Sequence, residues 1–170
     1  MKAPAIKRAQ ASLDLALWQA DAESMSSSDL YIWLRESGLP PEVAIRLKEL
    51  VNFTATVGTK VIRLGKVILI KLIEFIKQHP NLAVGMALGA AVSFIVGSIP
   101  FLGPLLTPIV LPLGLIVGAV AGHRLDQAQD QGTGRDSGFI SITQDVLEIA
   151  REFFILFVET VQAIADEIVI

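Results

Sequence analysis

The chain has 170 residues, of which 52% are hydrophobic and 18% charged, and its formal net charge is −3. A typical soluble domain holds about 45 to 50% apolar residues and about a quarter charged ones, so this composition predicts association with a membrane. The negative net charge argues against a nucleic-acid binder, and the lack of cysteine excludes disulfides, thiol nucleophiles and cysteine-ligated zinc.

Residues 1–39 predict two short amphipathic helices with a polar break between them. Ser28 suits the N-cap of the second helix, because its hydroxyl can accept a hydrogen bond from a free backbone amide. Gly38 and Pro40 are typical of the end of a helix, so the second helix should stop there.

Residues 40–79 predict one long, basic amphipathic helix that starts at Pro41 and stops before Pro80. At 100° per residue its basic side chains lie mostly on one side, opposite a broad apolar face. Such a helix can lie among lipid headgroups, where each basic group contributes on the order of 1 kcal/mol near an anionic surface. The alternative is an ordinary helix that faces a protein core. The residues expected to contact anionic lipid are Lys60, Arg63, Lys66, Lys71 and Lys77.

Residues 80–122 contain no charged residue and no histidine, and they predict a hydrophobic membrane hairpin. Its arms, 82–98 and 105–122, are close to the lower limit of roughly 17 residues needed to cross a bilayer as a helix, so a spanning and a re-entrant hairpin both remain open. Prolines remove backbone donors, and we expect the second arm to be kinked or partly irregular near its start, with its fully helical part beginning near Pro112. The residues of the tip and the kinks are Pro100, Gly103, Pro104, Pro108 and Pro112.

Small residues recur every fourth position along both arms of the hairpin. This spacing keeps them on one helix face, where a missing side chain lets another backbone approach closely within lipid. The two stripes can face each other within one hairpin or pack between subunits, and they favour a homo-oligomer. The stripe residues are Gly85, Gly89, Ser93, Gly97, Gly114, Gly118 and Gly122.

The charge distribution predicts the orientation of the hairpin. Residues 40–79 carry a net charge of +4, and both flanks of a hairpin emerge on the same side of the membrane. Basic residues favour the cytoplasmic side, so we expect a membrane protein with both termini in the cytoplasm.

After the hairpin, residues 123–140 predict a flexible, glycine-rich linker, and residues 141–170 an acidic amphipathic helix that mediates assembly. An anionic membrane would repel this helix, since residues 124–170 carry a net charge of −6. Its partner should therefore be the basic helix of the same chain or the same helix of a neighbouring subunit. Its apolar residues are Val146, Ile149, Phe153, Phe157, Val161, Ile164 and Ile168.

The sequence contains no catalytic pattern. His79 and His123 flank the hairpin without the carboxylates or spacing of a general base or a metal site. We therefore expect no enzyme, no cofactor, no metal and no small-molecule substrate.

Together these patterns predict an all-α membrane protein with a central hydrophobic hairpin between amphipathic helices. The hypothesis is a self-assembling protein that inserts in a bilayer, with anionic lipids as partners, and permeabilises it. The alternative is a scaffold that curves the membrane without a pore. In outline the hairpin resembles that of colicin pore-forming domains, and equally that of caveolin- or reticulon-type shaping proteins. A helical bundle that hides the hairpin until it is triggered is a variant of the first hypothesis.

Overall fold

The computed structural model describes residues 7–110, 112, 113 and 135–169, with the backbone alone for 135–144. Most of this chain is helical, which confirms the predicted helical class. Among the described residues, no helix combines the length and the apolar character needed to cross a membrane. In chain order the elements are α1 (Arg8–Ser24), α2 (Ser27–Glu36), α3 (Pro41–Leu50), β1 (Ala55–Val57), β2 (Lys60–Ile62), α4 (Leu64–Gln78), α5 (Val84–Ser98), η1 (Pro100–Leu102), α7 (Arg135–Ile164), η2 (Ala165–Glu167) and β3 (Ile168–Val169).

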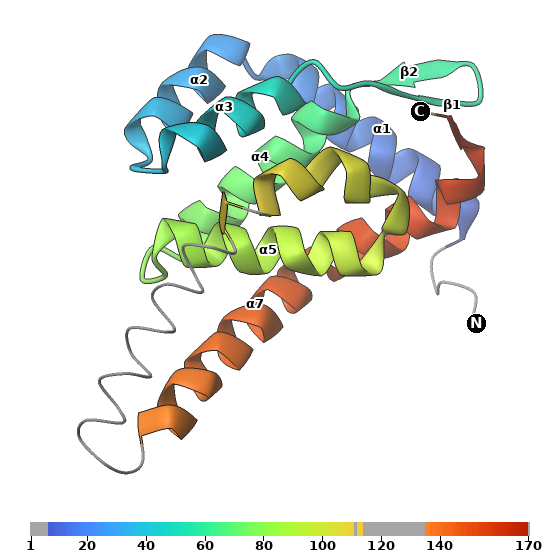
Figure 1. The fold of residues 1–170 in the computed structure, drawn as a ribbon. Coiled ribbons are helices and arrows are strands. Elements are labelled where there is room, and N and C mark those ends of the chain that lie inside the picture. Colours follow the sequence, from blue (N-terminus) through green and yellow to red (C-terminus); the bar gives the residue numbers. More distant parts are fainter. Residues whose placement is uncertain (1–6, 111, 114–134, 170) are drawn as a thin grey trace.

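The prediction of one continuous helix over residues 40–79 is wrong. The segment forms α3, then the antiparallel hairpin of β1 and β2, and then α4, as Figure 1 shows. Gly58 forms the turn of the hairpin with a φ of +60°, a conformation that side-chain-bearing residues rarely adopt. The β-branched residues of the two strands favour extended backbone, and the pairing of Ala55 with Ile62 aligns them.

Helix α4 lies at the centre of the fold, between the α2–α3 pair and the α5–α7 pair (Figure 1). Most of its side chains are buried, including Ile68, Leu69, Leu72 and Phe75, which are fully inaccessible. A helix that is apolar nearly all round is stable only when other elements cover it on several sides. The core therefore forms around α4.

The two N-terminal helices are α1 and α2, and the second is capped by Ser26 in place of the predicted Ser28. The Ser26 hydroxyl oxygen accepts a hydrogen bond of 3.1 Å from the backbone amide of Ser28. Ala11, Leu15 and Ala22 are the buried positions of α1, and they recur at intervals that keep them on one side of the helix.

The hairpin begins with α5 and reverses at η1. Of the two forms predicted for the start of the second arm, a partly irregular backbone before Pro112 is wrong, because residues 103–110 are helical. Pro104 lies in the first turn, where no intrahelical donor is needed, and Pro108 removes one intrahelical hydrogen bond. Leu106 and Ile109 are buried, and this packing holds the helix together despite the missing bond.

The end of the chain also differs from the prediction. Helix α7 already starts at Arg135, inside the predicted linker 123–140, and residues 123–134 lie outside the described part of the chain. The final helix does not reach Ile170, because α7 ends at Ile164 and β3 follows η2. Strand β3 pairs with β1 and completes a three-stranded antiparallel sheet in the order β2-β1-β3.

Candidate functional site

The candidate site is the apolar hairpin together with the helices that cover it. Six residues of α5 are buried, and Leu102, Leu106, Ile109 and Leu113 bury the tip and the second arm. All belong to one apolar cluster with residues of α4 and α7. The cover is mostly non-polar in character, although the side-chain amide of Gln162 in α7 donates a 2.8 Å hydrogen bond to the carbonyl of Ser98 in α5. The buried residues of α5 are Ala87, Leu88, Ala90, Ala91, Val92 and Ile95.

The small-residue stripe of α5 does not lie against another backbone at Gly85 and Gly97. A methyl group built on Gly85 or Gly97 would meet no atom within 4 Å. Ser93 is exposed and Gly89 is half-buried. The remaining predicted stripe residues, Gly114, Gly118 and Gly122, lie outside the described residues. At Gly85 and Gly97 the stripe therefore has open space next to the buried face of α5.

The predicted tip and kink residues come together around a cavity of about 850 Å³ between α3 and the second arm. Glu42 and Arg46 of α3 supply its charged side chains. Pro100 is exposed in η1, next to this region in the chain. The members of the predicted set that line the cavity are Gly103, Pro104, Pro108 and Pro112.

The five basic residues predicted to contact lipid do not share one helix face, so that part of the prediction is wrong. Lys60 lies in β2 and Arg63 just before α4, and both are exposed. Lys71 is half-buried, with its ammonium 5.0 Å from the ring centroid of Trp18. Lys77 is exposed in the last turn of α4. The β-hairpin is the physical reason, since it removes the first two residues from the helix.

Lys66 is buried, and only 3% of its surface is accessible. Its ammonium donates a 2.6 Å hydrogen bond to the carbonyl oxygen of Met25, the residue that follows the last residue of α1. Burial lowers the pKa of Lys66 from its ordinary 10.5, Arg63 lowers this pKa further, and Glu23 acts in the opposite direction. This contact fixes the α1–α2 junction on α4, so Lys66 has a structural role here.

The lowered pKa predicts a pH dependence of stability. Between the lowered pKa and 10.5 the unfolded chain holds the Lys66 proton more tightly than the folded one, so the free energy of unfolding should rise with pH in this interval. Lys66→Met should remove this contribution, whereas Lys77→Met, at an exposed site of the same helix, should retain it. Urea unfolding at pH values from neutral to about 10 measures the difference. Equal pH slopes in the two variants would contradict the burial of the ammonium.

The apolar stripe predicted on the final helix packs inside the same chain. Val146, Phe157, Val161 and Ile164 are buried, whereas Ile149 and Phe153 are half-buried. Phe153 and Phe154 place their rings 5.2 and 5.5 Å from the ring of Phe75 in α4. Ile168, the last member of the stripe, is half-buried in β3 opposite Val57. The stripe residues from Val146 to Val161 therefore pack in the main core with α4 and α5, whereas Ile164 packs in a smaller cluster with Ala11 and Leu15 of α1.

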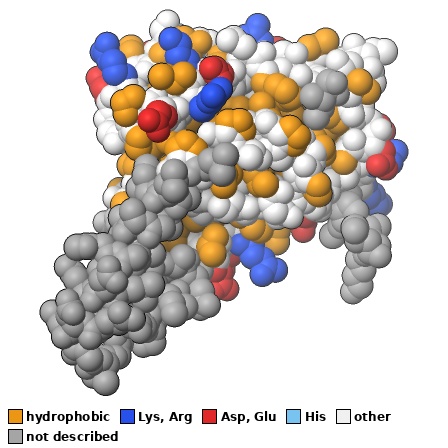
Figure 2. Space-filling model, viewed as in Figure 1, with side chains coloured by type: hydrophobic (Ala, Val, Ile, Leu, Met, Phe, Trp, Pro, Cys, Tyr) orange, Lys and Arg blue, Asp and Glu red, His pale blue; other side chains and the backbone are white. Residues whose placement is uncertain are grey.

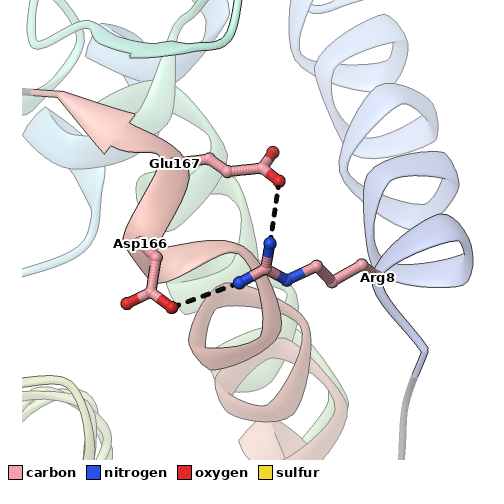
Figure 3. Close-up of polar contacts among 3 residues, drawn as sticks. All are labelled: Arg8, Asp166 and Glu167. Atoms are coloured by element: carbon pink, nitrogen blue, oxygen red, sulfur yellow. Dashed lines mark hydrogen bonds and ion pairs between the residues drawn. The ribbon is translucent and has the colours of Figure 1, made fainter.

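A pair of ion contacts joins the start of α1 to the end of the chain (Figure 3). The guanidinium of Arg8 lies 3.2 Å from the carboxylate of Asp166 and 3.3 Å from that of Glu167. These side chains are 43 to 88% exposed, so solvent and salt screen the pairs and each contributes about 1 kcal/mol or less. The two contacts therefore join α1 to η2 and add little to the stability of the fold.

Sequence reasoning missed two residues that position these elements. Gly65 lies where the backbone of Leu50 passes close to α4. The Gly65 amide donates a 3.1 Å hydrogen bond to the carbonyl oxygen of Phe53. Trp18 touches both Lys71 and Phe157, so it joins α1 to α4 and α7. A glycine inside an otherwise apolar helix was the available signal for the first. Trp18 carried only the signal of an apolar residue in a predicted amphipathic helix, which does not indicate the elements that it contacts.

Within the described ranges, no group of three histidine, aspartate or glutamate side chains is placed to hold a metal ion. No protein family model, curated protein or solved structure matches the chain.

Proposed function

We propose that this chain is a self-assembling membrane protein whose hairpin leaves the helical bundle, inserts in a bilayer and permeabilises it. The observation that carries the proposal is the uncharged stretch of 43 residues, 80–122, part of which packs against α4 and α7. Anionic lipids are the proposed partner, and the flanks of the inserted hairpin would remain in the cytoplasm.

The chemistry of the cover supports release of the hairpin. Apolar side chains such as Leu88, Val92 and Ile95 hold α5 in the bundle. Their transfer from a protein core to lipid has little hydrophobic cost, because both surroundings exclude water. The face that carries the second arm shows apolar side chains with few charged ones between them (Figure 2). The open space at Gly85 and Gly97 leaves room for a neighbouring helix after insertion.

A cross-link between the hairpin and its cover tests the proposal. The chain has no cysteine, so Ser98→Cys with Gln162→Cys creates a single reactive pair between α5 and α7, at positions already in hydrogen-bond contact. A short thiol-reactive cross-linker with a reducible bond should abolish dye release from anionic liposomes, because α5 can no longer leave α7. Reduction should restore the release.

The matched control places the same cross-linker within α1, through Gln19→Cys and Glu23→Cys, whose native side chains are joined by a 2.8 Å hydrogen bond. This cross-link leaves the hairpin free, and leakage should continue. Equal leakage from the α5–α7 cross-linked protein and its reduced form would show that the hairpin does not need to move.

Membrane shaping without a pore is the second candidate function. Ser93, Ser98 and Thr107 are the hydroxyl-bearing residues of the hairpin, and its lack of charged groups disfavours an ion path. Electron microscopy of the same liposomes separates the two functions. Tubules without leakage favour shaping, whereas leakage without tubules favours permeabilisation.

A further inference from the structure

The side of α7 that faces away from the core carries a symmetric pattern of residues. At 100° per residue, Glu148, Arg151, Ile155, Glu159 and Gln162 fall within one narrow arc, on the other side of the helix from the buried Ala150, Phe157 and Val161. Ile155 is 46% exposed, which is large for an isoleucine in the middle of a helix. We call these five residues the outer face of α7.

A groove of about 940 Å³ runs between the outer face and α5. All five residues of the outer face line it, and Ser93, Gly97 and Ser98 form part of its α5 wall. These three side chains are small, and the space above Gly97 is open. The α5 wall can therefore admit bulky side chains from another molecule.

The charges of the outer face select both the occupant and its direction. The pattern is symmetric about Ile155, because Arg151 and Glu159 lie four residues to either side and Glu148 and Gln162 lie seven. In an antiparallel pair of α7 helices related by a two-fold axis at Ile155, each Arg151 faces Glu159 of the other copy. A parallel pair would instead place Arg151 on Arg151 and Glu159 on Glu159, which is repulsive.

We propose that the outer face of α7 binds the same face of a second copy of this chain, antiparallel, with the two-fold axis at Ile155. Within the described residues, Arg151 and Glu159 have no ion-pair partner, and this arrangement gives each one. The contact also covers Ile155 and extends along about 20 Å of helix, from the rise of 1.5 Å per residue.

This interface differs from the assembly surface expected from the sequence, whose residues face the core of their own chain. It concerns the folded bundle and does not depend on insertion in a bilayer. Its tests use no liposomes, so a result against the dimer leaves the proposed permeabilisation standing, and a result against permeabilisation leaves the dimer standing.

A single cysteine at the axis gives the most direct test. Ile155→Cys brings the two new thiols together in the proposed dimer, and mild oxidation of the full chain should convert it to a disulfide-linked dimer. Leu156→Cys is the matched control, since Leu156 is equally exposed at 46% but lies about 100° around the helix. It should cross-link at least about tenfold more slowly, because only a residue on the two-fold axis lies next to the same residue of the other copy.

Charge reversal tests the direction of the pair. Arg151→Glu or Glu159→Arg alone places two like-charged pairs in the dimer, and each should weaken dimerisation by about tenfold. A mixture of the two variants should dimerise as the wild type does, because both contacts between unlike chains are again of opposite charge. Analytical ultracentrifugation measures all three samples, and circular dichroism verifies that each variant is folded.

Three results would overturn the proposal. The first is equal cross-linking at positions 155 and 156, and the second is a failure of the mixed variants to recover dimerisation. The third is a monomeric wild type together with an Ile155→Cys variant that forms no disulfide, which would leave the groove to a lipid chain or an unlike protein.

Discussion

Replacing Gly65 with alanine should lower the free energy of unfolding by about 3 kcal/mol or more, the upper range for an overpacked site. The new methyl group would overlap the carbonyl oxygen of Leu50 and lie 2.8 Å from the Cβ atom of Phe53. That carbonyl already accepts a 3.0 Å hydrogen bond from the amide of Phe53. The backbone must therefore shift and weaken the contact between the end of α3 and the start of α4.

Urea unfolding followed by circular dichroism measures this effect. Gly85→Ala is the matched control, since a methyl group there meets no atom within 4 Å. Alanine has the higher helix propensity, so this variant should be neutral or more stable by up to about 1 kcal/mol. Equal losses in the two variants would mean that α3 and α4 do not approach each other as described.

Truncation of Phe154 to alanine should cost about 3 to 5 kcal/mol of unfolding free energy, as for other buried phenylalanines. Phe154 is fully buried, and its ring lies 4.9 Å from that of Phe153 and 5.5 Å from that of Phe75. The substitution leaves a cavity where α7 meets α4 and removes these aromatic contacts. Denaturant unfolding of the full chain measures the loss.

Leu156→Ala is the control for Phe154→Ala, because Leu156 is two residues further along α7 and 46% exposed. It should cost less than about 1 kcal/mol, since surface substitutions change stability little. If both variants lose equally, α7 does not pack on α4 through the face described.

Local patterns in the sequence predicted several elements of this fold. The polar break near Ser26 and the Gly38 to Pro40 turn delimit α2, because capping and backbone restriction act within a few residues. The apolar stripe of α7 also indicated its buried side correctly at Val146, Phe157 and Val161. Such signals depend on the chain's own periodicity and need no knowledge of its neighbours.

The sequence by itself determined the helical class, the charge-free stretch 80–122 and the turn at η1, since these follow from composition, periodicity and helix-breaking residues. The tertiary structure alone decided the β-hairpin inside the predicted helix, because pairing of β1 with β3 joins residues more than a hundred positions apart. It also decided the burial of Lys66, whose partner is a backbone carbonyl in another helix. The close approach at Gly65 and the open groove beside Gly97 likewise depend on which other elements pack next to them. Local periodicity does not encode this packing.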